Sequence, residues 1–178
     1  MTQRNAPQPS VDRLTPFRGH PIVVGVEPGQ PELVAVTAAS WARALEVPVY
    51  FAFADPSRVA VREQPDGSVE HTDLNPDVAD EGWQKRGAQL QDTLAVLMAS
   101  TGVEWQFRYL AGRPDRALTH LARAVDASAI VVGTRRPGAA GRMHELLDGA
   151  VATHLTHHQH RPVLVVPLVV VDWKTALP

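Results

Sequence analysis

The chain has 178 residues, of which 44% are hydrophobic and 20% charged, and its formal net charge at pH 7 is −2. This composition is typical of one globular domain with its own core, and the small charge gives no general attraction to nucleic acid or to an anionic membrane. Because the chain has no cysteine, no signal-peptide pattern at its start and no window near the roughly 18 apolar residues of a membrane span, we expect a cytoplasmic protein without disulfides or thiolate chemistry.

The first part of the chain predicts buried strands that alternate with helices. Residues 1–19 are polar and contain proline, which favours a loose arm. "PIVVGV" (21–26) and "VPVYFAFA" (47–54) are nearly continuous apolar runs, as expected for strands buried on both faces. Between them, one helical face carries Val34, Ala38, Trp41 and Leu45. Strands of this kind, alternating with helices, indicate a parallel sheet covered on both sides.

An excursion follows the second predicted strand. Residues 58–74 contain two alternating segments around the turn sequence Pro65-Asp66-Gly67-Ser68, which predicts a surface β-hairpin. A long amphipathic helix is then expected, with Asn75 as its cap and Pro76 at its first position. Its apolar face contains Trp83, Leu90, Leu94 and Leu97.

The second half of the chain completes the alternating pattern. "VEWQFRYL" (103–110) has apolar residues on one face only, so we expect a strand at the edge of the sheet with one wet face. Residues 112–128 predict a helix with Leu118, Leu121, Ala122 and Val125 inward, and "AIVVG" (129–133) predicts a central strand. After a long loop, "LLDGAVATHLTHH" (146–158) predicts a last helix and "RPVLVVP" (161–167) a last strand.

Ligands of open parallel sheets bind beyond the carboxyl ends of the strands, so the loops after the strands are the candidate sites. They begin at Glu27, at Asp55 and at Gly133, and the last is the longest and richest in glycine. Its glycines allow close approach to an anion, the next helix contributes a positive N-terminus, and Arg135, Arg136 and Arg142 add charge. The alternative is a flexible crossing whose arginines are only solvated.

Two common phosphate-binding motifs do not fit this loop. "GTRRPGAA" has the glycine spacing of a Walker loop, but Ala139-Ala140 replaces the lysine and the hydroxyl residue. No GxGxxG occurs in the chain, which argues against a nicotinamide-binding Rossmann domain.

Three blocks resemble the universal stress protein family over residues 21–167: "PIVVGVEPG", "AGRPDRALTHLARAVDASAIVVGT" and "GAVATHLTHHQHRPVLVVP". The resemblance implies an α/β fold of three layers, with an open parallel five-stranded sheet of order 3-2-1-4-5, similar to the adenine nucleotide alpha hydrolases. The domain would cover residues 20–167, with the arm 1–19 before it and an extension 168–178 after it. It also implies a homodimer, often through the last strand (161–167), to which the apolar tail would add. From the small net charge we expect no nucleic-acid or membrane partner.

In many members of this family ATP lies between the first and fourth strands, and Mg²⁺ is a further candidate ligand. Carried over, the resemblance places Glu27 at the ribose and Val26, Ala54 and Val132 at the base. Around the phosphates it places Gly133, Thr134, Arg135, Gly138, Gly141, Arg142, Gly149 and Ala150.

This chain departs from the ATP-binding pattern Gly-x2-Gly-x9-Gly-Ser/Thr of the family. The interval from Gly133 to Gly149 is three residues longer, Arg136 stands at the second glycine, and Ala150 replaces the hydroxyl residue. Two hypotheses follow: an adenine-nucleotide-binding stress-response module, and a nucleotide-free interaction dimer with a degenerate site. A slow nucleotide hydrolase is a third and weaker one, because the magnesium hydroxyl and a general base are missing.

The histidines of "THLTHHQH" and the serines suggest no chemistry. His154 and His158 are one helical turn apart, but no third metal ligand stands at a matching position, and His158 falls on the predicted apolar face. No serine lies in a G-x-S-x-G sequence and the aspartates show no paired spacing. We therefore expect neither a metal site nor an enzyme.

Overall fold

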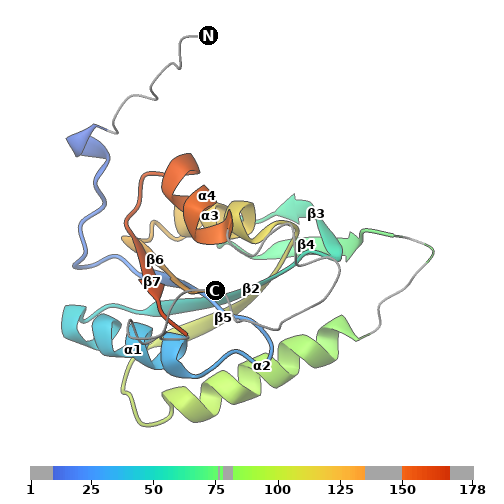
Figure 1. Cartoon of the computed structure of the whole chain (residues 1–178), viewed down its shortest axis with the longest axis horizontal. Helices are drawn as coiled ribbons and strands as arrows, with labels where there is room; N and C mark the ends of the chain where they lie inside the picture. Colours follow the sequence, from blue (N-terminus) through green and yellow to red (C-terminus); the bar gives the residue numbers. More distant parts are fainter. Residues whose placement is uncertain (1–9, 76, 78–81, 135–149, 169–178) are drawn as a thin grey trace, which may run out of the picture.

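A five-stranded parallel sheet forms the centre of the molecule (Figure 1). The structure is a computed structural model that describes residues 10–75, 77, 82–134 and 150–168. The strands lie in the order β5-β2-β1-β6-β7, which is the predicted order 3-2-1-4-5. Their bounds are β1 (Ile22–Gly25), β2 (Val49–Asp55), β5 (Trp105–Ala111), β6 (Ala129–Gly133) and β7 (Val163–Val166).

Helices cover both faces of this sheet, so the predicted three-layer architecture is confirmed. On one face lie α1 (Leu33–Leu45) and α2 (Trp83–Met98), and on the other α3 (Pro114–Ala124) and α4 (Ala150–His158) (Figure 1). Each parallel connection crosses from one strand to the next through a helix, as parallel sheets require. The chain order places β1 and β6 side by side at the centre.

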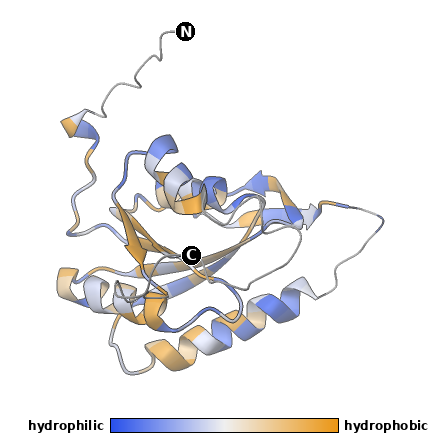
Figure 2. Cartoon of the chain, viewed as in Figure 1, coloured by the Kyte–Doolittle hydropathy of each residue, from blue (hydrophilic) through white to orange (hydrophobic). Residues whose placement is uncertain are grey.

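The core has two halves because successive strand residues point to opposite faces. On the side of α1 and α2, Val24, Phe51 and Val131 are fully buried against Ala38 and its neighbours. On the side of α3 and α4, the fully buried residues are Val23, Leu110, Leu121, Ile130 and Leu155. Figure 2 shows apolar residues concentrated on the strands at the centre of the molecule.

A two-stranded antiparallel hairpin, β3 (Arg58–Glu63) and β4 (Val69–Asp73), interrupts the alternation after β2. It occupies the segment for which the sequence predicts a hairpin. Its turn uses Gly67 at a φ of +80°, a backbone conformation that favours glycine. A Cβ at this position would collide with the buried side chain of Leu121 on α3, so the turn packs closely on that helix.

The hairpin also changes the surroundings of the edge strand β5. The sequence predicts one wet face for this strand, but Gln106 and Arg108 are half-buried. Arg108 lies 5.4 Å from the ring of Tyr50 and its guanidinium is 3.7 Å from the carboxylate of Asp66 in the hairpin turn. The prediction of a wet face was wrong because it treated the hairpin as separate from the sheet.

The start of α2 was also predicted wrongly. The helix begins at Trp83, after Gly82, and not behind an Asn75 cap. Asn75 instead accepts a hydrogen bond of 3.1 Å from the backbone N–H of Asp77, which is a local turn. Trp83 is half-buried at the start of the helix. Its ring packs against His71 and Tyr109, at centroid distances of 4.6 and 5.4 Å.

Candidate functional site

The central strands β1 and β6 separate at their carboxyl ends. They pair in register as far as Val24 and Val131. Beyond this point the chain after β1 continues to pair with β2, because the N–H of Val26 donates to the carbonyl of Ala52 at 2.9 Å. The chain after β6 continues to pair with β7, because the N–H of Thr134 donates to the carbonyl of Val166 at 2.8 Å. The two strand ends thus mark the topological switch point of the sheet, and we call the region beyond them the crevice, because ligands of such sheets bind at this place.

In the turn between β1 and α1, the side chain of Gln30 points toward the end of β6. The N–H of Gln30 donates to the carbonyl of Glu27 at 3.1 Å, and Gly29 takes a φ of +71°. In return, the N–H of Glu27 donates to Oε1 of Gln30 at 3.2 Å. This reciprocal pair fixes Glu27 at the end of β1 and directs the amide of Gln30 across to β6.

Gly133, at the end of β6, has no room for a side chain. A Cβ there would lie 2.8 Å from Nε2 of Gln30, 2.8 Å from Cδ1 of Leu168 and 3.1 Å from Cγ2 of Val34. The next residue, Thr134, accepts a hydrogen bond of 2.8 Å from the N–H of Leu168 through its Oγ1. The end of β6 is thus held between the β1–α1 turn and the chain that leaves β7.

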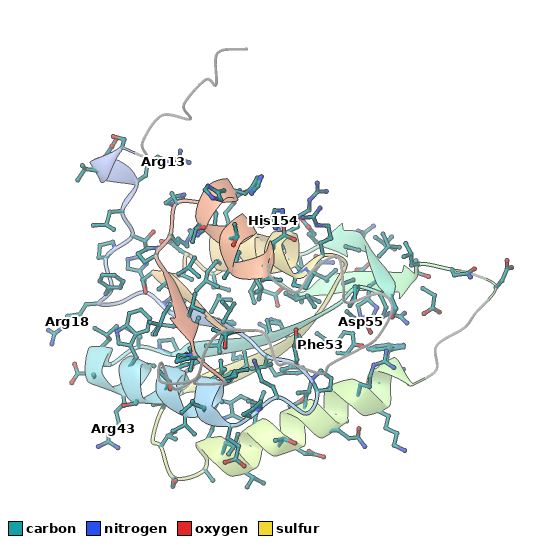
Figure 3. All side chains as sticks on the ribbon, viewed as in Figure 1. Arg13, Arg18, Arg43, Phe53, Asp55 and His154 are labelled. Carbon is teal, nitrogen blue, oxygen red and sulfur yellow. The ribbon has the colours of Figure 1, made fainter. Side chains whose placement is uncertain are left out.

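The strand β2 ends one residue beyond Ala54 in the carboxylate of Asp55, which begins one of the three candidate loops but was given no role in the predicted site. Asp55 is 4% exposed. Its Oδ1 accepts hydrogen bonds from the N–H and the hydroxyl of Ser57 at 2.9 and 2.6 Å, and its Oδ2 accepts from Arg86 at 2.8 Å and Tyr109 at 2.5 Å. Figure 3 labels Asp55 between the hairpin and the first turns of α2.

These hydrogen bonds set the charge of the cluster. Burial raises the pKa of Asp55, but the bonds from Ser57, Tyr109 and Arg86 outweigh burial and bring that pKa below its ordinary value. Burial and the bond to the Asp55 carboxylate raise the pKa of the Tyr109 hydroxyl. At neutral pH Asp55 is therefore an anion held beside a cation and a neutral phenol.

A second cluster ties the hairpin to α2. Arg58 donates from Nε to Nδ1 of His71 at 2.6 Å, pairs with Asp73, and lies 4.9 Å from the ring centre of Trp83. Burial, followed by the charge of Arg58, lowers the pKa of His71. His71 thus stays neutral and accepts the arginine N–H.

A groove of about 220 Å³ lies between the β1–α1 turn and α2. We call it the α1–α2 groove. Its apolar lining includes Val26, Ala35, Leu90 and Leu94. Polar side chains from both walls also line it: Glu27, Gln30, Glu32, Arg86, Gln89 and Thr93. The groove begins at Val26 and Glu27, directly after the end of β1.

The structure brings part of the predicted site together. Val26 and Glu27 directly follow β1, Val132 and Gly133 end β6, and Thr134 directly follows it. Ala54 lies on the next strand, buried and in register with Leu110, two residues beyond the level of Gly25. Ala150 is the first residue of α4. The remaining predicted residues lie outside the described part of the chain: Arg135, Gly138, Gly141, Arg142 and Gly149.

The sequence contained a signal for some of the residues that were missed. Asp55 directly follows a buried strand, which is where functional side chains of parallel sheets gather. Arg86 precedes Leu90 by one helical turn, so it lies on the stripe of α2 that faces the sheet. Tyr109 and Gln30 carried no comparable signal, because their roles depend on contacts between distant segments.

The histidine-rich end of α4 has no core role. His158 is exposed, so the packed position considered for it is wrong. Its ring stacks on His154 at 5.6 Å and its Nδ1 lies 2.9 Å from the carbonyl of His154. Within residues 10–75, 77, 82–134 and 150–168, no group of three or more metal-binding side chains occurs. No helix among these residues is both long and apolar enough to cross a membrane.

Comparison with known proteins identifies the relatives of this fold. Residues 19–167 match the model of the universal stress protein family. A universal stress protein from Archaeoglobus fulgidus is 25% identical, with a TM-score of 0.58 over 84% of this chain and 94% of that one. No curated protein sequence matches the chain significantly.

Two further solved structures share the fold and contain nucleotides. One is the universal stress protein from Archaeoglobus fulgidus in complex with dAMP, which is 23% identical with a TM-score of 0.56 over 83% of this chain and 97% of that one. The other is a universal stress protein in complex with cAMP, which is 20% identical with a TM-score of 0.54 over 84% and 98%. Because the family model spans most of the chain, this protein belongs to the universal stress protein family.

Proposed function

We propose that this protein is a dimeric stress-response module that binds an adenine nucleotide, ATP first among them, and acts by binding rather than by catalysis. The observation that carries the proposal is the end of β1–β6 pairing at Val24 and Val131, which makes the strand ends at Glu27 and Gly133 the switch point of the sheet. A crevice at this place in an open parallel sheet is the usual nucleotide position. Relatives of the same fold bind dAMP and cAMP, which supports an adenine nucleotide as ligand.

In this proposal each part of the ligand meets a different set of residues. Glu27 accepts hydrogen bonds from the ribose hydroxyls, and Val26, Ala54 and Val132 lie near the base. Gly133 lets the backbone approach the phosphates, and the N-terminus of α4 at Ala150 stabilises their charge. Thr134 and the loop residues add phosphate contacts: Arg135, Gly138, Gly141, Arg142 and Gly149. Mg²⁺ accompanies ATP through its phosphate oxygens.

The same proposal includes a homodimer through the edge strand β7 and the tail after it. β7 ends the sheet, and its Leu164 and Val165 are 37% and 38% exposed. An exposed apolar edge strand is a template for pairing with another strand. A second copy that pairs through β7 covers these side chains and places two crevices in one assembly.

Isothermal titration calorimetry of the purified protein with ATP, ADP and AMP tests the proposal. We expect saturable heat with ATP, and Arg142→Ala should weaken ATP more than AMP because it removes a contact to the outer phosphates. Equal losses for both nucleotides would place the phosphates elsewhere. If the protein gives no heat with any of the three, it is the nucleotide-free interaction dimer, for which Arg136 and Ala150 already argue.

A further inference from the structure

We infer that the segment before β1, residues 11–17, is a docking surface for a second copy of this chain and completes the interface that begins at β7. This inference rests on the proposed homodimer. Three apolar side chains of the segment face solvent: Val11 is 85% exposed, Leu14 58% and Phe17 38%. Val11 begins a 3₁₀ turn (Val11–Arg13), in which residues three apart lie on the same side. Val11 and Leu14 therefore present one apolar surface.

The segment is held against the body of the domain, so this surface has a fixed place. Phe17 packs on Trp41 of α1, with the ring centroids 5.9 Å apart. After it, Nδ1 of His20 lies 3.2 Å from the carboxylate of Asp126, and the hydroxyl of Ser128 donates to the carbonyl of His20 at 3.4 Å. A surface that is ordered before binding loses less conformational entropy when a partner covers it.

The middle of the segment lies close to the start of β7. Burial and the charges of Arg161 and Arg13 lower the pKa of His160, so Arg13 is near the loop that joins α4 to β7. Figure 1 shows the segment on the same side of the molecule as α4 and β7. The surface of Val11 and Leu14 therefore borders the edge of the sheet at which the proposed dimer forms.

The Phe17 end of the segment and β7 share one face of the sheet. Val166 packs in the core on the side of α1, and Trp41 packs against the same cluster. Leu164 is two residues earlier in β7, so its side chain leaves the strand on this same face. The exposed part of Leu164 and the Phe17–Trp41 pair thus lie on the α1 side, where a second copy paired through β7 can cover both.

The strand β7 alone offers too little surface for a stable dimer. It has four residues (Val163–Val166), which span about 13 Å at the usual rise of a strand. Of its side chains, Leu164 and Val165 are exposed, each by little more than a third. Each partner of a stable interface buries roughly 600–1,000 Å². The three apolar residues of the segment add to this edge the kind of area that a second copy needs.

Symmetry indicates what the segment meets in the second copy. Two copies of one edge strand that extend a sheet across a two-fold axis pair antiparallel, so the start of one β7 lies beside the end of the other. The exposed Pro167 and the half-buried Leu168 follow the end of β7. The segment of one copy therefore lies against Pro167 and Leu168 of the other, and apolar side chains meet from both sides.

A dilution series followed by analytical ultracentrifugation tests the docking surface. The double variant Val11→Ser/Leu14→Ser removes apolar area at exposed positions. The matched control is Val61→Ser/Val96→Ser, since these residues are 67% and 78% exposed on β3 and α2, which contact β5 at the opposite edge of the sheet. We expect the dissociation constant of the dimer to rise by about tenfold or more for the first pair and to keep the wild-type value for the control.

The outcomes of this series separate the docking surface from the dimer itself. A wild-type dissociation constant for Val11→Ser/Leu14→Ser would overturn the docking surface and leave the dimer through β7 standing. A wild-type protein that stays monomeric at all concentrations would overturn both.

Cross-linking tests what the segment meets. The chain has no cysteine, so Leu14→Cys and Pro167→Cys each introduce a single thiol. The two variants are co-expressed, one of them with a tag, so that the mixed dimer has its own mass. With a short bismaleimide we expect a cross-linked mixed dimer, and only background when Val96→Cys replaces Leu14→Cys. A yield no greater than this background would show that the segment does not reach the end of the second copy's β7, and the assignment would fall.

Discussion

The hydroxyl of Tyr109 donates a hydrogen bond of 2.5 Å to Oδ2 of Asp55, and this bond joins the carboxyl ends of the adjacent strands β5 and β2. The same carboxylate binds Arg86 from α2 and Ser57 from the segment that leads into the hairpin. One buried anion thus connects the sheet, a helix and the hairpin, beside the α1–α2 groove. Its loss should affect both the stability of the fold and the position of Arg86.

Asp55→Ala should therefore destabilise the protein strongly. The substitution removes the acceptor that Tyr109 and Arg86 share, and each lost hydrogen bond to a charged group costs about 1.5–3 kcal/mol. We expect the free energy of unfolding in urea to fall by about 2–4 kcal/mol, and by about 1 kcal/mol for Tyr109→Phe, which removes one bond only. Glu70→Ala, at an exposed site on the hairpin, is the control and should change little. A loss for Asp55→Ala as small as that of the control would show that the network contributes nothing.

His71 should make stability depend on pH. In the folded protein its pKa is below the ordinary value of 6.5, since burial and Arg58 oppose its protonation. Between pH 6.5 and that lowered pKa the unfolded chain binds a proton that the folded chain does not, so the free energy of unfolding falls as the pH decreases through this range. The pKa of Asp55 is also below its ordinary value of 3.8, so the free energy of unfolding falls further as the pH decreases below 3.8.

Urea unfolding at several pH values from 7 to 5 checks this dependence. His71→Gln should reduce the loss between pH 6.5 and 5, because an amide oxygen can accept the N–H of Arg58 without titrating. The free energy of unfolding of this variant should still fall somewhat between pH 6.5 and 5, because burial and the charge of Arg161 also lower the pKa of His160. His157→Gln, at an exposed position, should leave the profile as it is. An identical profile for the wild type and His71→Gln would contradict the role of His71.

The fold was predictable because its signals are local. Val23 and Val24 belong to a short apolar run. Runs of this kind between amphipathic helices indicate a parallel sheet, whatever the order of the strands in it. The hairpin turn was equally local, since Asp66, Gly67 and Ser68 carry their own turn chemistry. The strand order came from the family resemblance and is confirmed.

The site was predictable only where it coincides with strand ends. Glu27 and Gly133 follow buried strands, so the topology alone places them together. The Asp55 cluster required the packing of β5, α2 and the hairpin, which no single-sequence pattern encodes. The prediction for the start of α2 failed although Asn75 and Pro76 are good helix-start residues. The described helix begins at Trp83, whose ring packs on His71 and Tyr109 from distant segments.

Gly133→Ala should impair the proposed ligand site more than the fold. The new methyl group meets Nε2 of Gln30 and Cδ1 of Leu168 at 2.8 Å, and both are ends of flexible side chains that can move away. Their movement narrows the crevice, so we expect ATP affinity to fall by about tenfold and the free energy of unfolding by about 1 kcal/mol. Calorimetry and urea unfolding measure the two effects.

A second substitution separates steric blocking from a general loss of structure. Gln30→Ala in the Gly133→Ala background removes one of the three contacts, so part of the lost affinity should return. If Gly133→Ala binds ATP as well as the wild type does, the ligand does not approach the end of β6.

The edge strand β7 provides the test of the proposed dimer. Leu164 and Val165 are consecutive, so their side chains leave the strand on opposite faces, and both are more than a third exposed. Because a charge buried in an apolar interface is strongly unfavourable, Leu164→Asp and Val165→Asp should each weaken association through this strand. Size-exclusion chromatography with light scattering should give a dimer for the wild type and a monomer for the double variant. Val96→Asp, on exposed helix surface, should remain dimeric. A double variant that still elutes as a dimer would place the interface on another surface, and the pairing of two crevices through β7 would fall with it.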